Sequence, residues 1–118
     1  LKDEQPSESS AAIRERVMRA RAIQQLRFAE YNQTATTPIH CNAQMTSKLV
    51  RIYCPLDAQG DKLLAYSMEK LGLSARAYDR ILKVARTIAD LAESKTIAAS
   101  HLMEAISYRN LDRSDWLG

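Results

Sequence analysis

The chain has 118 residues, of which 46% are hydrophobic and 26% are charged. This length and balance fit one compact domain with a single core and leave little room for a second domain. Glycine and proline number only three each, and alanine, leucine and arginine are abundant, so we expect an all-α fold. The formal net charge of +3 permits contact with phosphates but is too small to identify a nucleic-acid partner.

Cysteine content and hydrophobic run length limit where the protein can act. Two cysteines are too few for a disulfide scaffold, so we expect reduced thiols in a cytoplasmic protein. No apolar run approaches the roughly 20 residues that span a bilayer, so we expect no membrane partner. The first ten residues are polar and acidic and lack an initiator methionine, so we interpret 1–9 as the remnant of a linker from an upstream ATPase domain.

The first half of the chain predicts one long helix and one short helix. A serine cap at Ser9 or Ser10 starts the first helix, which we expect to end near residue 29. Its apolar positions recur at helical spacing and predict its core face: Ile13, Val17, Met18, Ala20, Ala22, Ile23, Leu26 and Ala29. Proline and β-branched residues predict a loop at 31–41. Asn42 is the predicted cap of a second helix at 44–53, which ends before Pro55.

The second half predicts three further helices. The third runs from a cap at Asp57 to Gly72, a residue type that favours the left-handed conformation after a helix end. Ser74 caps the fourth and longest helix, about 75–92, with a predicted core face of Ile81, Leu82, Val84, Ala85, Ile88, Ala89 and Leu91. A short helix at 99–108 and a flexible tail at 110–118 complete the chain. We therefore expect a four- to five-helix bundle over 10–109.

No motif in the sequence builds a complete catalytic site. The phosphate-binding Gly-x-x-x-x-Gly-Lys-Ser/Thr loop, Gly-x-Gly-x-x-Gly and His-Glu-x-x-His are all absent. The candidate zinc ligands are His40, Cys41, Cys54 and His101. No two of them have the short spacing that is typical of structural zinc sites, so a zinc site is disfavoured. We therefore expect no metal, no catalytic residue and no ATP hydrolysis in this chain by itself.

The first helix is basic, because residues 10–29 contain five arginines and one acidic residue, Glu15. The arginines are Arg14, Arg16, Arg19, Arg21 and Arg27. Such a helix could contact the phosphates of a nucleic acid. The arginines point around much of the helix, however, so a solvated surface or a subunit interface is favoured over DNA.

A second basic cluster opens the fourth helix. Arg76 follows the cap Ser74 by two residues, where the helix dipole and the unpaired N–H groups favour an acid. Arg80 and Lys83 lie four and seven residues further on, so three cations share one face that could hold a polyanion. The alternative is that aspartates on the same helix neutralise its cations and leave Arg76 exposed with no ligand to bind. The pairs would be Asp79 with Lys83 and Asp90 with Arg86. The residue pattern favours neither interpretation.

Residues 71–91 read Leu71-Gly-Leu-Ser-Ala-Arg-Ala-Tyr-Asp-Arg-Ile-Leu-Lys-Val-Ala-Arg-Thr-Ile-Ala-Asp-Leu. This stretch resembles the C-terminal domain of magnesium-chelatase-like AAA+ ATPases and is close to the competence protein ComM group. Further matching segments extend the resemblance over about 8–113: Gln25-Leu-Arg-Phe, Tyr53-Cys-Pro-Leu-Asp, His101-Leu-Met-Glu-Ala-Ile and Tyr108-Arg-Asn-Leu-Asp.

This resemblance implies a helical lid in which an arginine at a helix start, called sensor 2, contacts the phosphates of ATP. Arg76 occupies the matching position, and Arg80 is a further candidate. The implied parent is an ATP hydrolase that uses ATP and Mg²⁺, whereas the fragment by itself is expected to need no cofactor. The implied partners are an upstream AAA+ core domain, neighbouring subunits in a ring, expected to be a hexamer, and DNA.

Two other functions stay open at this point. One is a stand-alone basic helical domain that binds nucleic acid through the arginines of the first helix. The other is a plain helical adaptor. A phosphate-binding loop upstream in the parent gene would separate the lid from the nucleic-acid-binding domain, because only the lid requires one.

Overall fold

The structure is a computed structural model that describes residues 8–117, with side chains described over 8–108. Its elements are α1 (Ser10–Thr34), the 3-10 helix η1 (Asn42–Gln44), α2 (Ser47–Tyr53), α3 (Ala58–Leu71), α4 (Ala75–Leu91) and α5 (Ala99–Leu117). No strand occurs between residues 8 and 117, so the all-α prediction is confirmed. The predicted linker at 1–9 lies outside the described residues except for Glu8 and Ser9.

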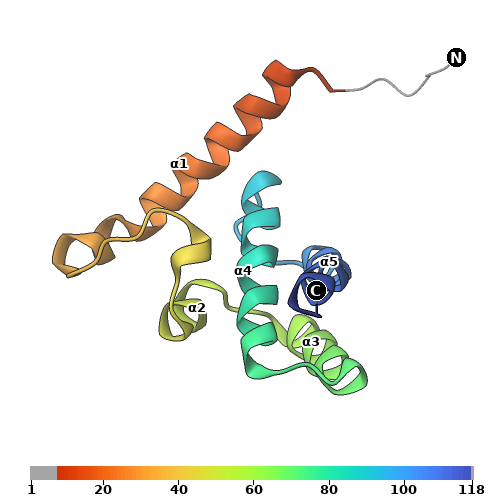
Figure 1. Ribbon diagram of the computed structural model, residues 1–118. Helices are drawn as coiled ribbons and strands as arrows, with labels where there is room; N and C mark the ends of the chain where they lie inside the picture. The colour runs from red at the N-terminus through yellow and green to blue at the C-terminus, as the bar shows by residue number, and fades with distance from the viewer. Residues whose placement is uncertain (1–7, 118) are drawn as a thin grey trace, which may run out of the picture.

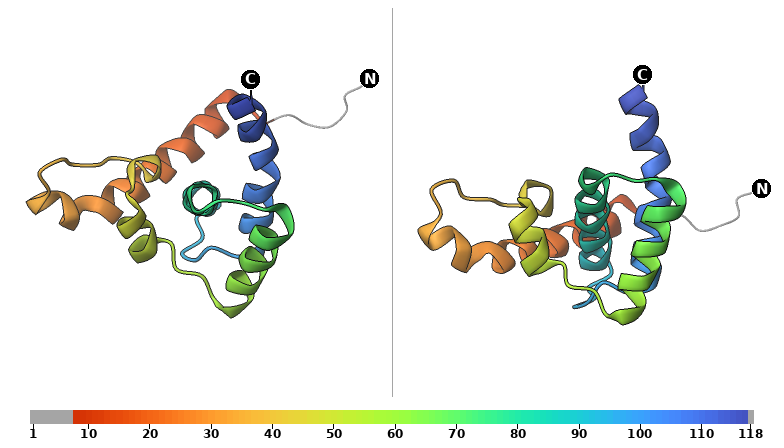
Figure 2. Two further views of the ribbon diagram at one scale, coloured as in Figure 1. Left: turned by 60° about the horizontal axis from the view of Figure 1, so that its bottom comes forward. Right: turned by 90° about the horizontal axis from the view of Figure 1, so that it is seen from below.

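Helix α4 is the centre of the fold (Figure 1). It contacts α1, η1, α2 and α5, whereas α3 packs mainly against α5. Seen along its own axis, α4 is surrounded by the other elements (Figure 2). One core cluster joins α1, the loop after it, α2, α3, α4 and α5, with Phe28, Val50, Leu64 and Leu102 among its most buried side chains. The chain segments therefore share a single hydrophobic core.

The helix boundaries follow local capping chemistry. Ser9 Oγ accepts a hydrogen bond from the Ala12 amide at 3.0 Å, and Asp57 Oδ1 accepts from the Gly60 amide at 2.7 Å. Ser74 Oγ accepts from the Ala77 amide at 3.2 Å and fixes the start of α4. Gly72 ends α3 with φ of 60°, a left-handed conformation that glycine adopts without the penalty of a Cβ atom. These capping predictions are confirmed.

The predicted cap of α2 is wrong. Asn42 begins η1 instead, and Thr46 caps α2 by accepting a hydrogen bond from the Leu49 amide at 3.3 Å. The reason is that the Asn42 side chain bonds to core polar groups and cannot serve a helix end.

Two helices run beyond their predicted ends. Helix α1 continues to Thr34 because the side-chain amide of Asn32 holds the following loop against its last turns. This amide donates a hydrogen bond to the Ile39 carbonyl at 2.7 Å and accepts one from the Ile39 N–H at 3.0 Å. Helix α5 continues to Leu117, beyond the end predicted near residue 108. The flexibility predicted for 110–118 concerns motion and stays a prediction.

The core face predicted for α1 is largely wrong. The helix buries Ala20, Gln24 and Phe28, spaced four residues apart, while Met18 and Leu26 are 61% and 79% exposed. Apolar residues lie on both sides of α1, so the pattern alone could not tell which side meets the core.

A buried carboxylate links the helices around α4. The side chain of Asp90 is fully buried and accepts hydrogen bonds from Arg27 at 2.6 and 2.8 Å. It also accepts from Asn42 Nδ2 at 2.9 Å and pairs with Arg86 at 3.3 Å. Gln24 completes the contact by accepting a hydrogen bond from the Asn42 amide at 2.9 Å. These bonds tie α1 and η1 to the C-terminal half of α4.

Arg86 extends this network into the turn after α4. Its guanidinium donates to the Ser94 and Lys95 carbonyls at 2.8 and 3.1 Å. Glu93 adopts a left-handed φ of 56°, which turns the chain so that these carbonyls face back toward α4. Burial lowers the pKa of Arg86, and Asp90 opposes that effect.

Removing one partner of this buried cluster should destabilise the fold severely. Arg27→Ala leaves the Asp90 charge short of a partner inside the protein, a change that typically costs about 3–5 kcal/mol. We expect urea denaturation followed by circular dichroism to show this loss. Arg19→Ala removes an exposed pair with Glu93, which should cost less than about 1 kcal/mol. Equal midpoints for the two variants would contradict a dominant role for the buried cluster.

The two cysteines should differ sharply in reactivity. Cys54 lies in the core, and burial raises its pKa to about 11, an effect that Arg86 and Arg27 only partly offset, whereas Cys41 is exposed. At pH 8 only about one Cys54 in a thousand is then a thiolate, the species that reacts. We expect iodoacetamide to alkylate Cys41 in the native protein and Cys54 only after unfolding, as read by peptide mass spectrometry. Equal rates in native buffer would show that Cys54 is not buried in solution.

Candidate functional site: a basic groove beside α4

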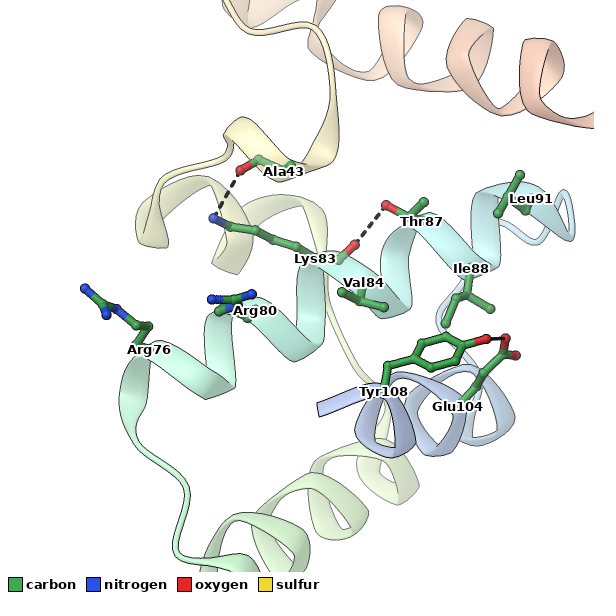
Figure 3. Close-up of a pocket in the computed structure, with 10 residues that line it drawn as sticks. All are labelled: Ala43, Arg76, Arg80, Lys83, Val84, Thr87, Ile88, Leu91, Glu104 and Tyr108. Atoms are coloured by element: carbon green, nitrogen blue, oxygen red, sulfur yellow. Dashed lines mark hydrogen bonds between the residues drawn. The ribbon is translucent and has the colours of Figure 1, made fainter. Parts of the chain in front are cut away.

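A groove of about 780 Å³ runs along one face of α4. It is bounded by η1 on one side and by α5 on the other (Figure 3). Its lining residues are Ala43, Arg76, Arg80, Lys83, Val84, Thr87, Ile88, Leu91, Glu104 and Tyr108. The three cations that the sequence placed on one face therefore line a concave surface.

Arg76 lies at the open end of this groove. It is exposed in the first turn of α4, which contains no acidic residue. Within the described part of the chain Arg76 has no ion pair, and its side chain extends away from the bundle (Figure 3). The amide dipoles of the helix start add to its positive charge. Arg76 is thus a cation placed where a bound anion would be stabilised by both.

Lys83 and Arg80 occupy the middle of the same face and are half-buried. The Lys83 ammonium donates to the Ala43 carbonyl at 3.3 Å, which bridges α4 to η1 (Figure 3). The pairing of Lys83 with Asp79 that we considered from the sequence is not formed, because Asp79 accepts a hydrogen bond from the Ser47 hydroxyl instead. The pairing of Asp90 with Arg86 is formed, but it is buried in the core.

The apolar face predicted for α4 divides into two parts. Ile81, Leu82, Ala85 and Ala89 are buried in the core, as predicted. Val84, Ile88 and Leu91 are only half-buried and line the groove beside the cations. The cations and these apolar residues are therefore neighbours along the groove, and the core side of α4 also holds Arg86 and Asp90.

The wall that α5 contributes carries an acid and a phenol. The Tyr108 hydroxyl donates to Glu104 Oε2 at 2.8 Å, and this hydrogen bond raises the pKa of Tyr108. Figure 3 places the Tyr108 ring near Ile88, toward the end of the groove away from Arg76. Sequence reasoning missed both residues, since helical spacing identifies neighbours within a helix and not across two helices.

The arginines of α1 do not form one surface. Arg27 is 12% exposed and is bonded to Asp90 and Asn42 inside the protein. Arg16 pairs with Glu8, and Arg19 pairs with Glu93 and Glu15. Of the five α1 arginines, only Arg14 and Arg21 are exposed and form no ion pair with any residue among 8–108. The surface charge of α1 is therefore much smaller than the sequence count indicates.

The residues considered for zinc are dispersed. Among the described residues no group of three or more His, Cys, Asp or Glu side chains could hold a metal ion. His101 Nδ1 instead accepts a hydrogen bond from the Ala98 amide at 2.9 Å, near the start of α5. No described helix is long and apolar enough to cross a membrane.

Comparison with known proteins places the chain in a family. The family model described as "Magnesium chelatase, subunit ChlI C-terminal" matches residues 7–109. The uncharacterised protein YifB of Escherichia coli is 44% identical over 108 residues, which are 92% of this chain and 19% of that protein. Competence protein ComM of Haemophilus influenzae is 42% identical over 106 residues, which are 90% of this chain and 19% of that protein.

The chain thus spans about a fifth of the length of these curated relatives. Its helical fold and a family match that covers most of its residues agree with each other. The chain belongs to the family of magnesium chelatase ChlI C-terminal domains.

Proposed function

We propose that this domain is the helical lid of a magnesium-chelatase-like AAA+ ATPase and that Arg76 is its sensor-2 residue, which contacts the phosphates of ATP. The observation that carries this proposal is the position of Arg76. It is an exposed guanidinium in the first turn of α4, without an ion pair in the described chain, at the mouth of a basic groove.

The chemistry of arginine suits this role. A guanidinium stays charged at any physiological pH and offers several N–H donors in one plane, so it can bind two phosphate oxygens at once. Losing the terminal phosphate after hydrolysis removes the strongest partner of such a group. The lid would then change its position relative to the rest of the ATPase, which couples hydrolysis to movement.

The parent protein supplies what this chain lacks. In the proposal an upstream core domain holds ATP and Mg²⁺, and neighbouring subunits form a ring, expected to be a hexamer. Arg80 is a second candidate for contact with the phosphates, because it lines the groove one turn beyond Arg76. Competence protein ComM is among the relatives, so we propose DNA as the material on which the cytoplasmic parent acts.

A stand-alone nucleic-acid-binding domain is a weaker candidate. It depended on five arginines of α1, of which Arg27 is held in the core by Asp90. Arg16 and Arg19 are paired with acids, which leaves Arg14 and Arg21 as the cations available for phosphate contacts or for contact with a subunit. Two such contacts give weak binding.

Replacing Arg76 in the full-length protein should impair ATP turnover without harming the fold. A charge-assisted hydrogen bond to phosphate is worth about 1.5–3 kcal/mol, so Arg76→Ala should lower turnover roughly ten- to a hundredfold. The variant domain should keep its stability, because Arg76 is exposed and its charge opposes the helix dipole. Steady-state phosphate release and thermal unfolding measure the two effects.

Two variants serve as controls for that experiment. Arg51→Ala removes an exposed arginine from the last turn of α2, outside the groove, and should leave turnover unchanged. Arg80→Ala removes a cation one turn deeper in the groove and should have the smaller effect of the two groove variants. Wild-type turnover in Arg76→Ala, or a larger loss in Arg80→Ala, would refute the assignment of Arg76.

Binding of this chain to DNA should be weak and independent of sequence. Neutralising two phosphates predicts a slope of about −2 in a plot of log affinity against log salt concentration. Arg14→Ala with Arg21→Ala should remove most of this binding, whereas Arg16→Ala with Arg19→Ala should remove less. Fluorescence anisotropy with two unrelated duplexes is the measurement, and tight, salt-resistant, sequence-selective binding would favour the stand-alone DNA-binding function instead.

A further inference from the structure

A second pocket lies between α1, α2 and the turn that follows α4, and we call it the turn pocket. It shares no lining residue with the groove beside α4. Its volume of about 560 Å³ lies within the range of ligand sites, which is roughly 300–1,000 Å³. Its lining combines cations with apolar side chains: Arg27, Arg86, Lys95, Ile23, Leu26 and Tyr53. The proposed contact with ATP uses none of these residues.

The buried charges beside the turn pocket do not balance. Arg27 and Arg86 are 12% and 5% exposed, and they share one buried acid, Asp90. Burial lowers the pKa of Arg86, and repulsion from Arg27 lowers it further, while Asp90 acts against both effects. A buried cation is tolerated only beside a partner of opposite charge. Two cations and one carboxylate therefore leave this part of the protein short of negative charge.

The rim of the turn pocket adds to this shortage. Lys95 is exposed and pairs with no acid among residues 8–108. Glu93 is the one acid among the described lining residues, and Arg19 already holds its carboxylate at 3.0 Å. The potential is therefore positive from the floor of the pocket to its rim and favours an anionic ligand.

Arg86 also carries a hydrogen-bond donor that no described group satisfies. Its Nη1 and Nη2 atoms donate to the Lys95 and Ser94 carbonyls at 3.1 and 2.8 Å. Its buried Nε atom has no acceptor among the described residues. Native proteins rarely leave a buried N–H without an acceptor. Because Arg86 lines the pocket, a carboxylate bound there would supply both the missing acceptor and the missing charge.

The apolar part of the pocket continues beyond it along α1. Leu26 is 79% exposed at the pocket rim, and Ala22 and Met18 precede it at four-residue steps, with Met18 61% exposed. These three residues extend the apolar surface by about 12 Å. A small acid that fills the pocket leaves most of this strip in water, whereas a protein segment covers the pocket and the strip together. The surface therefore favours a protein ligand over a free small acid.

We infer that the turn pocket receives an acidic side chain from an apolar protein segment. The carboxylate lies beside Arg86 and Lys95, and the neighbouring apolar side chains of the segment lie on Leu26, Ala22 and Met18. Nε of Arg86 is buried, so the incoming carboxylate displaces the side chains that cover it. This contact is independent of the ATP contact proposed for α4, because the pocket and the groove have no lining residue in common.

The test titrates the 118-residue chain with the capped peptide acetyl-Gly-Leu-Asp-Leu-Gly-Ser-amide and with its counterpart that has Asn in place of Asp. NMR follows the Arg86 Nε–H signal and the Leu26 methyl signals. The Asp peptide should shift both and bind at least about tenfold more tightly than the Asn peptide, because only its carboxylate forms charge-assisted hydrogen bonds. Equal affinity for the two peptides, or an Arg86 signal that stays in place at saturation, would overturn the inference.

Two further probes separate a protein segment from other anions. Phenylpropanoate carries a carboxylate on an apolar group but cannot cover the strip along α1, so it should bind more weakly than the Asp peptide. Met18→Asp should weaken binding of the peptide and leave binding of phenylpropanoate unchanged. Inorganic phosphate has no apolar part and should bind most weakly. If either small anion binds as tightly as the Asp peptide, the pocket is a site for free anions and the inference is wrong.

Matched variants locate the two parts of the ligand, while the buried arginines that hold the core are left unchanged. Leu26→Asp places a negative charge at the rim and should abolish binding of the Asp peptide. Ile52→Asp makes the same change at a 55% exposed residue outside the pocket and should not. Lys95→Ala should lower the affinity several-fold, and Arg51→Ala, also outside the pocket, should leave it unchanged. Thermal unfolding checks that each variant folds, and wild-type affinity in a folded Leu26→Asp variant would contradict the inference.

Discussion

The buried carboxylate of Asp90 is the constraint on which the rest of this domain depends. A buried charge is tolerated only when it is paired and hydrogen-bonded, and here Arg27, Asn42 and Arg86 meet that need from three parts of the chain. Hydrophobic packing allows helices to slide and rotate at modest cost, whereas these bonds fit only one arrangement. The position of α4 relative to α1 and η1 is therefore set by charge and hydrogen bonding as much as by packing.

This constraint also determines which face of α4 is available for a ligand. The core side of the helix is occupied by Ile81, Ala85, Ala89 and the Arg86–Asp90 pair. The side that remains runs from Arg76 to Leu91 and lies between η1 and α5, which form the walls of the groove. Because η1 is tied to Asp90 through Asn42, the wall and the floor of the groove share one anchor. Structure and candidate function are thus connected through Asn42.

Much of the fold could be predicted from the sequence, because caps and glycine stops act locally. Asp57, Ser74 and Gly72 each fulfil the role that their immediate neighbours dictate. The core could be predicted less well. Helical spacing treats polar residues as surface, so it missed the buried Gln24 and Asn42 and the half-buried Arg27. Apolar residues on both sides of α1 also left its orientation undetermined.

The candidate site, like the fold, could be predicted from the sequence only in part. Arg76 was a candidate because a cation two residues after a helix cap conflicts with the helix dipole, and the family resemblance, not the residue pattern, gave it the sensor-2 position. Glu104 and Tyr108 could not be predicted, because only the packing of α5 against α4 brings them to the groove. The arginine count of α1 was misleading for a related reason, since the acids that pair with Arg19 and Arg27 are far away in sequence.

The central claim is that Arg76 touches the phosphates of ATP, and the most direct test is a crystal or cryo-electron microscopy structure of the full-length protein with a non-hydrolysable ATP analogue. We expect an Arg76 guanidinium nitrogen to lie about 2.7–2.9 Å from a phosphate oxygen, the distance of a charge-assisted hydrogen bond. An Arg76 side chain that still extends into solvent, with another cation of the protein occupying the place beside the terminal phosphate, would contradict it.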